Sequence, residues 1–179
     1  KQAKEAELTF QQAFELFYFA RGAGAEVLFS VFDAERVDWC ERIGVNVYKV
    51  AHSKRADIDI LRAIEATGKP VFISYSTPMP AGALGERRIP LYCIPEYPTT
   101  IDMLNVTEPF DMLNGWAHGF SDHTIGIDVA KILIAKDVEY LEKHYCMNYS
   151  IGVDAKWSMD MEDLMELSRW NKLVSKLCP

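Results

Sequence analysis

The sequence predicts an α/β fold of the (β/α)8 TIM-barrel type, with only about six βα units present in this chain. Apolar runs of strand length alternate with amphipathic segments of helix length, and such alternation is typical of a parallel sheet. Polar and titratable residues directly follow the apolar runs. Because the carboxyl ends of the strands form the catalytic face of a (β/α) barrel, the pattern predicts an enzyme site at that edge.

Capping residues and breakers delimit the expected elements. Thr9 and Gln12 have the spacing of a capping box at the start of the first helix. Asp33 and Asp57 are suited to cap the next two helices, and Gly44 is suited to end the first of these two. The expected helices span residues 8–22, 33–42, 57–67, 127–135 and 161–176. The expected strands span residues 26–32, 45–51, 70–76, 91–94, 116–121 and 138–144.

The composition indicates one soluble domain, residues 1–179, of ordinary hydrophobic content. A net charge of -7 argues against a nucleic-acid partner. No apolar run is long enough to span a bilayer and no leader peptide is recognisable, so we expect no membrane partner and a cytoplasmic location. The four cysteines form no CxxC pair, which favours reduced thiols over a zinc ribbon or redox motif.

Two histidines at the ends of late strands are candidate metal ligands. His123 and His144 each lie close to an acidic residue, and neutral imidazole is a common ligand of Mn, Fe and Zn. Two strand-end ligands, with water and substrate at the other positions, would make an open Lewis-acid site. Asp122, Glu142 or Asp154 could complete the ligand set or orient an imidazole. The alternative is two structural histidines bonded to backbone.

Further polar residues follow other predicted strands. Hydroxyls at strand ends can bind phosphate oxygens and a lysine can add positive charge, although each serine could equally be a capping residue. Strand alternation puts Glu142 on the same face as His144, and Tyr97 could contact a sugar-like substrate or simply pack in its loop. The candidate phosphate-binding residues are Ser30, Lys49, Ser74 and Ser121.

Several segments, in order, give the chain a family resemblance. The most specific are Phe120-Ser121-Asp122-His123-Thr124-Ile125-Gly126 and Glu142-Lys143-His144. Supporting segments are residues 48–51, residues 68–74, and the stretch from Tyr92-Cys93 through Tyr97-Pro98. With these motifs the sequence resembles the N-acetylneuraminate (sialic acid) synthase family, which includes legionaminate, pseudaminate and spore-coat polysaccharide synthases. The resemblance runs from about residue 8 to residue 165.

The resemblance implies a (β/α)8 barrel that condenses phosphoenolpyruvate with an N-acylmannosamine-type sugar to give a nonulosonic acid. In the family, two histidines matching His123 and His144 hold a divalent metal, usually Mn, with Mg or Co as alternatives. C3 of phosphoenolpyruvate attacks the sugar aldehyde, water adds at C2, and phosphate leaves. The resemblance assigns phosphoenolpyruvate contacts to Ser30, Lys49, Ser74 and Ser121, and catalytic or sugar-contacting roles to Glu142, Asp154 and Tyr97. A homodimer is also expected.

The chain departs from the family pattern at several positions. The family's first two strands and its small C-terminal antifreeze-like domain have no counterpart here. His52, Lys54 and Pro95 stand where the family usually has a serine, an acid, and an asparagine or serine. Two alternatives therefore stay open: a degenerate barrel that acts as a binding or assembly module, and another metal-dependent aldolase with a pyruvate-type donor.

Overall fold

A computed structural model of the chain describes residues 7–78, 85, 87–104, 115–150 and 152–177. Its internal contacts divide the chain into two compact units, residues 1–72 and 73–179. The third strand, β3, runs through this boundary. In both units the strands neighbour each other in chain order, β1-β2-β3 in the first and β3-β4-β5-β6 in the second.

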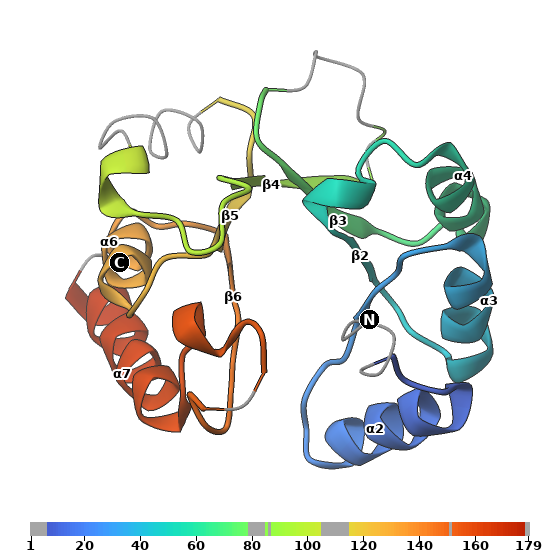
Figure 1. Ribbon diagram of the computed structural model, residues 1–179, viewed down its shortest axis with the longest axis horizontal. Helices are drawn as coiled ribbons and strands as arrows, with labels where there is room; N and C mark the ends of the chain where they lie inside the picture. The colour runs from blue at the N-terminus through green and yellow to red at the C-terminus, as the bar shows by residue number, and fades with distance from the viewer. Residues whose placement is uncertain (1–6, 79–84, 86, 105–114, 151, 178–179) are drawn as a thin grey trace. The chain divides into compact units, whose positions relative to one another are not determined.

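The first unit alternates short strands with three α-helices (Figure 1). Its elements are α2 (Phe10–Gly22), β1 (Phe29–Ser30), α3 (Ala34–Ile43), β2 (Tyr48–Val50), the 3-10 turn η1 (His52–Lys54), α4 (Ile58–Thr67) and the start of β3 (Val71–Tyr75). The predicted caps are confirmed: Thr9 and Gln12 form the capping box, and Asp33 and Asp57 accept from backbone N–H groups of α3 and α4. Gly44 ends α3 in the left-handed conformation.

The core of the first unit lies between its strands and helices. Helix α3 packs on α4 and contacts α2. Its inward residues Val37, Cys40 and Ile43 are buried, as their helical spacing predicts. Strand β2 is buried at all three positions, which is the pattern of a parallel strand covered on both faces.

The second unit contains the longer strand ladder. Its elements are the end of β3, β4 (Arg88–Cys93), the 3-10 turn η2 (Ile101–Met103), β5 (Gly119–Asp122), α6 (Asp128–Ala135), β6 (Tyr140–Lys143), the 3-10 turn η3 (Ala155–Trp157) and α7 (Met161–Leu177). β4 pairs with β5, and β5 with β6, both in parallel. Helix α7 packs on α6, and the Trp170 indole donates to the Lys131 carbonyl at 2.9 Å across this contact.

Gly119 is required by the close approach of three strands. It lies opposite Leu91 on β4 and Tyr140 on β6. A Cβ atom at this position would lie 2.3 Å from the Tyr140 carbonyl oxygen and 2.7 Å from Cδ2 of Leu91. Only glycine therefore allows β5 to start in register with both of its neighbours.

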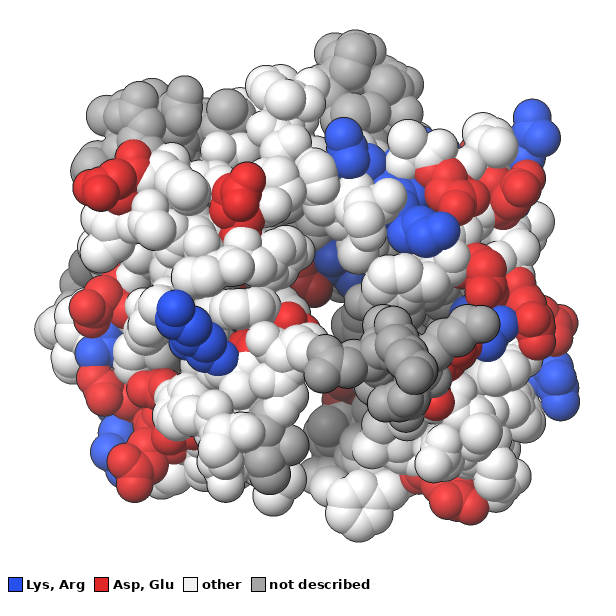
Figure 2. Space-filling view, viewed as in Figure 1, with Lys and Arg blue, Asp and Glu red and all other residues white. Residues whose placement is uncertain are grey.

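The predicted alternation of strands and helices is confirmed, and the differences lie at element ends. β1 covers two residues rather than residues 26–32, whereas β4 starts at Arg88 instead of residue 91. The 3-10 turns at His52–Lys54, Ile101–Met103 and Ala155–Trp157 were not predicted. Acidic and basic side chains lie interspersed on the face shown in Figure 2. No helix among the described residues has the length and apolarity needed to cross a membrane.

Candidate active site

The ladder between β5 and β6 places two pairs of polar residues opposite each other. Ser121 lies across from Glu142, and Asp122 lies across from Lys143. Because side chains alternate along a strand, these two pairs face opposite sides of the sheet. His123 and His144 directly follow the two strands. The residues that precede them, Asp122 and Lys143, are therefore paired in one ladder.

Ser121 connects two other predicted site residues. Its hydroxyl lies 2.6 Å from Oε2 of Glu142, to which it donates a hydrogen bond. The Ser74 Oγ atom lies 2.9 Å from Ser121 Oγ. Ser74 and Ser121 are both buried. The structure thus brings Ser74 of β3, Ser121 of β5 and Glu142 of β6 together as a hydrogen-bonded row.

The surroundings of His123 fix its tautomer. Its Nδ1 atom lies 3.1 Å from the Ile94 carbonyl oxygen, and a carbonyl can only accept, so Nδ1 carries the proton. In the neutral ring Nε2 then keeps its lone pair, which is the form that binds a metal. The His123 carbonyl accepts from the Thr99 N–H at 3.0 Å, so the backbone at this residue is also held.

His144 is oriented by a returning loop. The Met159 N–H donates to the His144 carbonyl at 2.8 Å, and the Cys146 N–H donates to the Met159 carbonyl at 2.9 Å. This short parallel bridge returns the chain to the end of β6, and Oδ2 of Asp154 lies 3.7 Å from His144 Nδ1. Asp154 therefore acts on the Nδ1 side of the ring and favours Nε2 as the ligand atom.

The two imidazoles lie beside each other and next to the aromatic rings of Tyr97 and Trp157. Their ring centroids lie 5.6 Å apart. The Tyr97 ring lies 4.1 Å from that of His123 and 6.2 Å from that of His144. Trp157, which the sequence reasoning missed, lies 5.8 Å from Tyr97 and 6.4 Å from His144. Its position in a 3-10 turn beyond the last strand gave no periodic signal.

The electrostatics of the cluster favour a neutral His123. Burial lowers the pKa of His123 below its ordinary value of 6.5, and the nearby His144 acts in the same direction, against the opposing effect of the bond to Ile94. Burial also raises the pKa of the Tyr97 hydroxyl, with the neighbouring Cys93 and Glu142 adding to the effect. A neutral imidazole is the form that coordinates a metal ion.

The donor set fits a divalent cation through two imidazoles. Both Nδ1 atoms face oxygen acceptors, which leaves Nε2 of each ring as the candidate ligand atom. Within the described ranges, no group of three or more His, Cys, Asp or Glu side chains is arranged around a cation-sized space. A bound ion would therefore draw only these two ligands from the described residues, with water or substrate at further positions.

The expectation that Asp122 could complete the ligand set is wrong. Its Oδ2 atom lies 2.9 Å from Lys143 Nζ, and its Oδ1 atom accepts from the backbone N–H and hydroxyl of Thr124. Asp122 is completely buried on the face opposite Ser121. Of the three acids considered, Asp154 is the one beside an imidazole and Glu142 the one bonded to Ser121.

Ser30 and Lys49 belong to the first unit. They lie opposite each other on β1 and β2, so the structure brings these two together. Lys49 is buried, and its ammonium donates to the Val50 carbonyl at 3.3 Å. Their roles toward phosphoenolpyruvate stay predictions.

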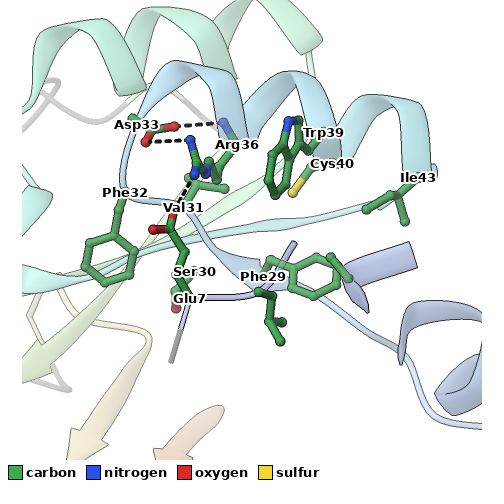
Figure 3. Close-up of a pocket in the computed structure, with 12 residues that line it drawn as sticks. Glu7, Phe29, Ser30, Val31, Phe32, Asp33, Arg36, Trp39, Cys40 and Ile43 are labelled. Carbon is green, nitrogen blue, oxygen red and sulfur yellow. Dashed lines mark hydrogen bonds and ion pairs between the residues drawn. The ribbon is translucent and has the colours of Figure 1, made fainter. Parts of the chain in front are cut away.

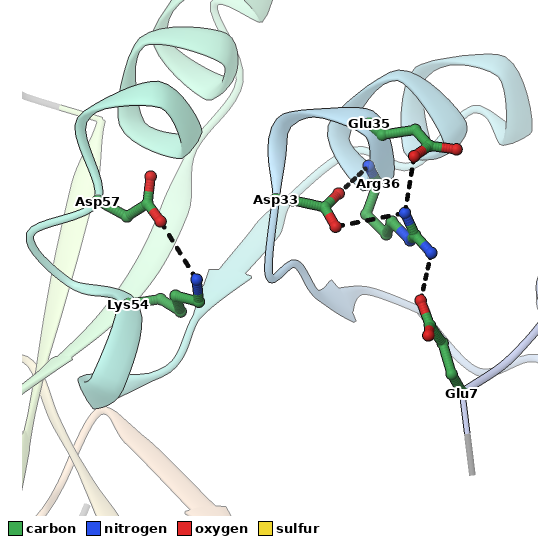
Figure 4. Close-up of polar contacts among 6 residues, drawn as sticks. All are labelled: Glu7, Asp33, Glu35, Arg36, Lys54 and Asp57. Atoms are coloured by element: carbon green, nitrogen blue, oxygen red, sulfur yellow. Dashed lines mark hydrogen bonds and ion pairs between the residues drawn. The ribbon is translucent and has the colours of Figure 1, made fainter. Parts of the chain in front are cut away.

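A largely apolar cavity of about 540 Å³ adjoins Ser30 in the first unit (Figure 3). Arg36 lies at this cavity and forms ion pairs with Glu7, Asp33 and Glu35 (Figure 4). Lys54, expected in a substrate-facing position by the resemblance, forms an ion pair with Asp57 at 3.2 Å. The positive charges of Arg36 and Lys54 are thus both balanced by carboxylates of the same unit.

The parallel ladder and its polar strand ends define an α/β protein of the (β/α)-barrel class with a paired-imidazole site. The chain belongs to the NeuB family, whose model matches residues 1–178. It is 23% identical to N,N'-diacetyllegionaminic acid synthase of Campylobacter jejuni, over 97% of this chain and 56% of that protein. It is 27% identical to pseudaminic acid synthase of Helicobacter pylori, over 82% of this chain and 47% of that protein.

A solved structure supports the fold class. The chain superposes on the N-acetylneuraminic acid synthetase of Leptospira borgpetersenii, solved in complex with citrate, with a TM-score of 0.83 and 21% identity. The match covers 97% of this chain and 65% of that one. The predicted barrel-type fold and family resemblance are therefore confirmed. The chain spans about half the length of the two synthases named above.

Proposed function

We propose that the protein containing this chain is a synthase of nonulosonic acids. In the proposed reaction, phosphoenolpyruvate condenses with an N-acylmannosamine-type sugar and phosphate is released. Membership in the NeuB family and the names of the legionaminic and pseudaminic acid synthase relatives support this reaction class. The single observation that carries the proposal is the His123–His144 pair beside the bonded Ser121 and Glu142 at the ends of β5 and β6.

His123 and His144 are the proposed ligands of a divalent metal, Mn in the first instance, with Mg or Co as alternatives. When bound, such an ion supplies Lewis-acid polarisation of the sugar aldehyde. The Ile94 carbonyl and Asp154 lie on the Nδ1 sides of the two rings, which favours Nε2 of each ring as the ligand atom. Burial lowers the pKa of His123, which favours its neutral form.

Ser74 and Ser121 are the proposed contacts of phosphoenolpyruvate in the second unit, and Ser30 and Lys49 those in the first. Hydroxyl and ammonium donors suit a phosphate and a carboxylate. The proposed role of Ser74 and Ser121 is to hold C3 of phosphoenolpyruvate toward the aldehyde carbon, which contributes by proximity and orientation. The 2.9 Å contact between Ser74 and Ser121 supports a shared role for these two hydroxyls.

Glu142, Asp154 and Tyr97 are the proposed catalytic and sugar-contacting residues. A carboxylate that accepts from Ser121 can take the proton of the water that adds at C2, while the aldehyde oxygen becomes a hydroxyl. Tyr97 lies against His123 with about half of its surface exposed, which suits a residue that contacts a sugar. Asp154 is the proposed orienting group of His144.

A cytoplasmic homodimer is the proposed form of the protein. Among the described residues, Cys40, Cys93 and Cys146 form no disulfide, and reduced thiols are usual in a reducing compartment. Phosphoenolpyruvate is an intracellular metabolite, which supports the same location.

Phosphate release tests the reaction directly. The intact protein is incubated with Mn²⁺, phosphoenolpyruvate and a panel of N-acyl hexosamines, and inorganic phosphate and the nonulosonic acid are measured. The proposal predicts release that needs both the metal and one sugar of the panel. Binding of neither Mn²⁺ nor phosphoenolpyruvate would favour a non-catalytic module. Condensation with a pyruvate-type donor and without phosphate release would favour another aldolase.

A further inference from the structure

We propose that the buried ion pair between Asp122 and Lys143 positions the two imidazoles of His123 and His144. The inference deepens the proposed metal role and rests on it. Asp122 immediately precedes His123 and Lys143 immediately precedes His144. Their side chains meet at 2.9 Å on the face of the sheet opposite Ser121 and Glu142. Both are therefore positioning residues rather than ligands.

The pair is almost wholly removed from solvent. The exposed fractions of the Lys143 and Asp122 side chains are 2% and 0%. Breaking a buried pair leaves an uncompensated charge, so the geometry of such a pair is tightly constrained. Asp122 and Lys143 lie opposite each other in the ladder. Their ion pair therefore fixes the register of the ends of β5 and β6.

The pair also brackets His123 on both sides. Lys143 Nζ donates to the Thr124 carbonyl at 2.9 Å as well as to Asp122. The backbone N–H and the hydroxyl of Thr124 donate to Asp122 Oδ1 at 2.8 and 2.7 Å. The residues before and after His123 are thus tied to the residue before His144. A shift of one imidazole relative to the other would require this whole network to rearrange.

The network has a consequence for metal affinity. A bound ion needs both Nε2 atoms at coordination distance together, and groups behind metal ligands typically change affinity by about 10- to 100-fold. The expected effect of Asp122→Asn is therefore a loss of Mn²⁺ affinity of about this size. The amide oxygen introduced by this substitution can still accept from Thr124, so the charge is removed while the local turn is kept.

The test compares Asp122→Asn, Lys143→Met and the double variant with Leu133→Ala. Leu133 is buried in α6, so Leu133→Ala lowers stability without touching the pair. Mn²⁺ affinity is measured by calorimetry, and histidine ring nitrogens are recorded by NMR without metal. The proposal predicts weaker Mn²⁺ binding and changed His123 and His144 ring signals in all three pair variants, and neither change in Leu133→Ala. The double variant leaves no unpaired charge and remains informative if a single variant does not fold.

The outcomes separate this inference from the proposed function. Pair variants that lose only stability, with unchanged ring signals and Mn²⁺ affinity, would overturn the positioning role. If the wild-type protein binds no Mn²⁺, the proposed metal role fails, and the ring signals of the variants still decide the positioning role.

Discussion

The hydroxyl of Ser121 donates to the carboxylate of Glu142 at 2.6 Å, directly across the β5–β6 ladder. The next residues on these two strands form a second, buried pair on the other face. Each strand therefore presents one polar group toward the candidate site and one toward the opposite side of the sheet, and a histidine directly follows each strand. This arrangement makes the roles of Glu142 and Lys143 separable by substitution.

Glu142→Gln is expected to lower the rate of phosphate release by about 10²- to 10⁴-fold, the usual contribution of a general acid or base. The amide keeps the size of the side chain and an acceptor for Ser121, but it cannot take a proton. Steady-state phosphate release with saturating substrates measures the effect. Glu139→Gln is the matched control, because Glu139 is an exposed residue just before β6 that pairs with His118. Equal rates in Glu142→Gln and wild type would remove Glu142 from the proton-transfer role.

The lowered pKa of His123 predicts a pH dependence of stability. Because its folded-state pKa lies below 6.5, the unfolded chain binds a proton first as the pH falls. Stability from this residue is fully present above about pH 6.5 and is lost as the pH falls toward the folded-state pKa. Urea unfolding between about pH 5 and pH 8 should therefore show a shallower slope in His123→Asn than in wild type.

The exposed His118 provides the control for this experiment. It lies beside Glu139 with 56% of its side chain exposed. Below about pH 6.5, His118→Asn should lose stability with falling pH as steeply as the wild type does. Identical slopes for wild type and His123→Asn would contradict the buried, neutral state of His123.

Gly119→Ala is expected to destabilise the protein by about 1–3 kcal/mol, as overpacking usually does. The added methyl would collide with the Tyr140 carbonyl at 2.3 Å, and a carbonyl held in a ladder cannot move freely. Gly85→Ala is the control, since a Cβ there meets nothing within 4 Å. Chemical denaturation followed by circular dichroism measures both. Full stability in Gly119→Ala would show that β5 and β6 are not as close as described.

How much of the fold could be predicted from the sequence differs between the helix caps and the strand ends. Capping at Thr9, Asp33 and Asp57 depends on local backbone chemistry, and all three caps are present. Strand ends depend on ladder hydrogen bonds with a neighbour, which apolar content alone does not encode. For this reason β1 is shorter than its apolar run and β4 begins at the polar Arg88.

The site shows the same division. Strand alternation correctly separated Glu142 from Lys143, because the two-residue period is a property of every strand. The same rule puts Asp122 on the face away from Ser121, so Asp122 is not the acid, of the three considered, that could complete the ligand set. The position of Trp157 depends on the bridge between Tyr145 and Met159. Such a loop return has no signature in the sequence.

Trp157 offers a spectroscopic reporter of the site. Its ring lies 6.4 Å from that of His144, and Mn²⁺ is paramagnetic, so a bound ion should quench its fluorescence. Trp157→Phe is expected to lose most of the Mn²⁺-dependent quenching. Trp170→Phe should keep it, because Trp170 lies on α7 and is bonded to α6. Quenching that survives in Trp157→Phe and disappears in Trp170→Phe would locate the ion elsewhere.

Binding of Mn²⁺ to the intact protein, followed by electron paramagnetic resonance of the free ion, tests the paired-histidine site most directly. We predict saturable binding by the wild type, and its loss in His123→Ala and also in His144→Ala, because each variant removes one of two required ligands. His118→Ala should bind as the wild type does. Undiminished binding in both site variants, or none by the wild type, would contradict a metal site at His123 and His144.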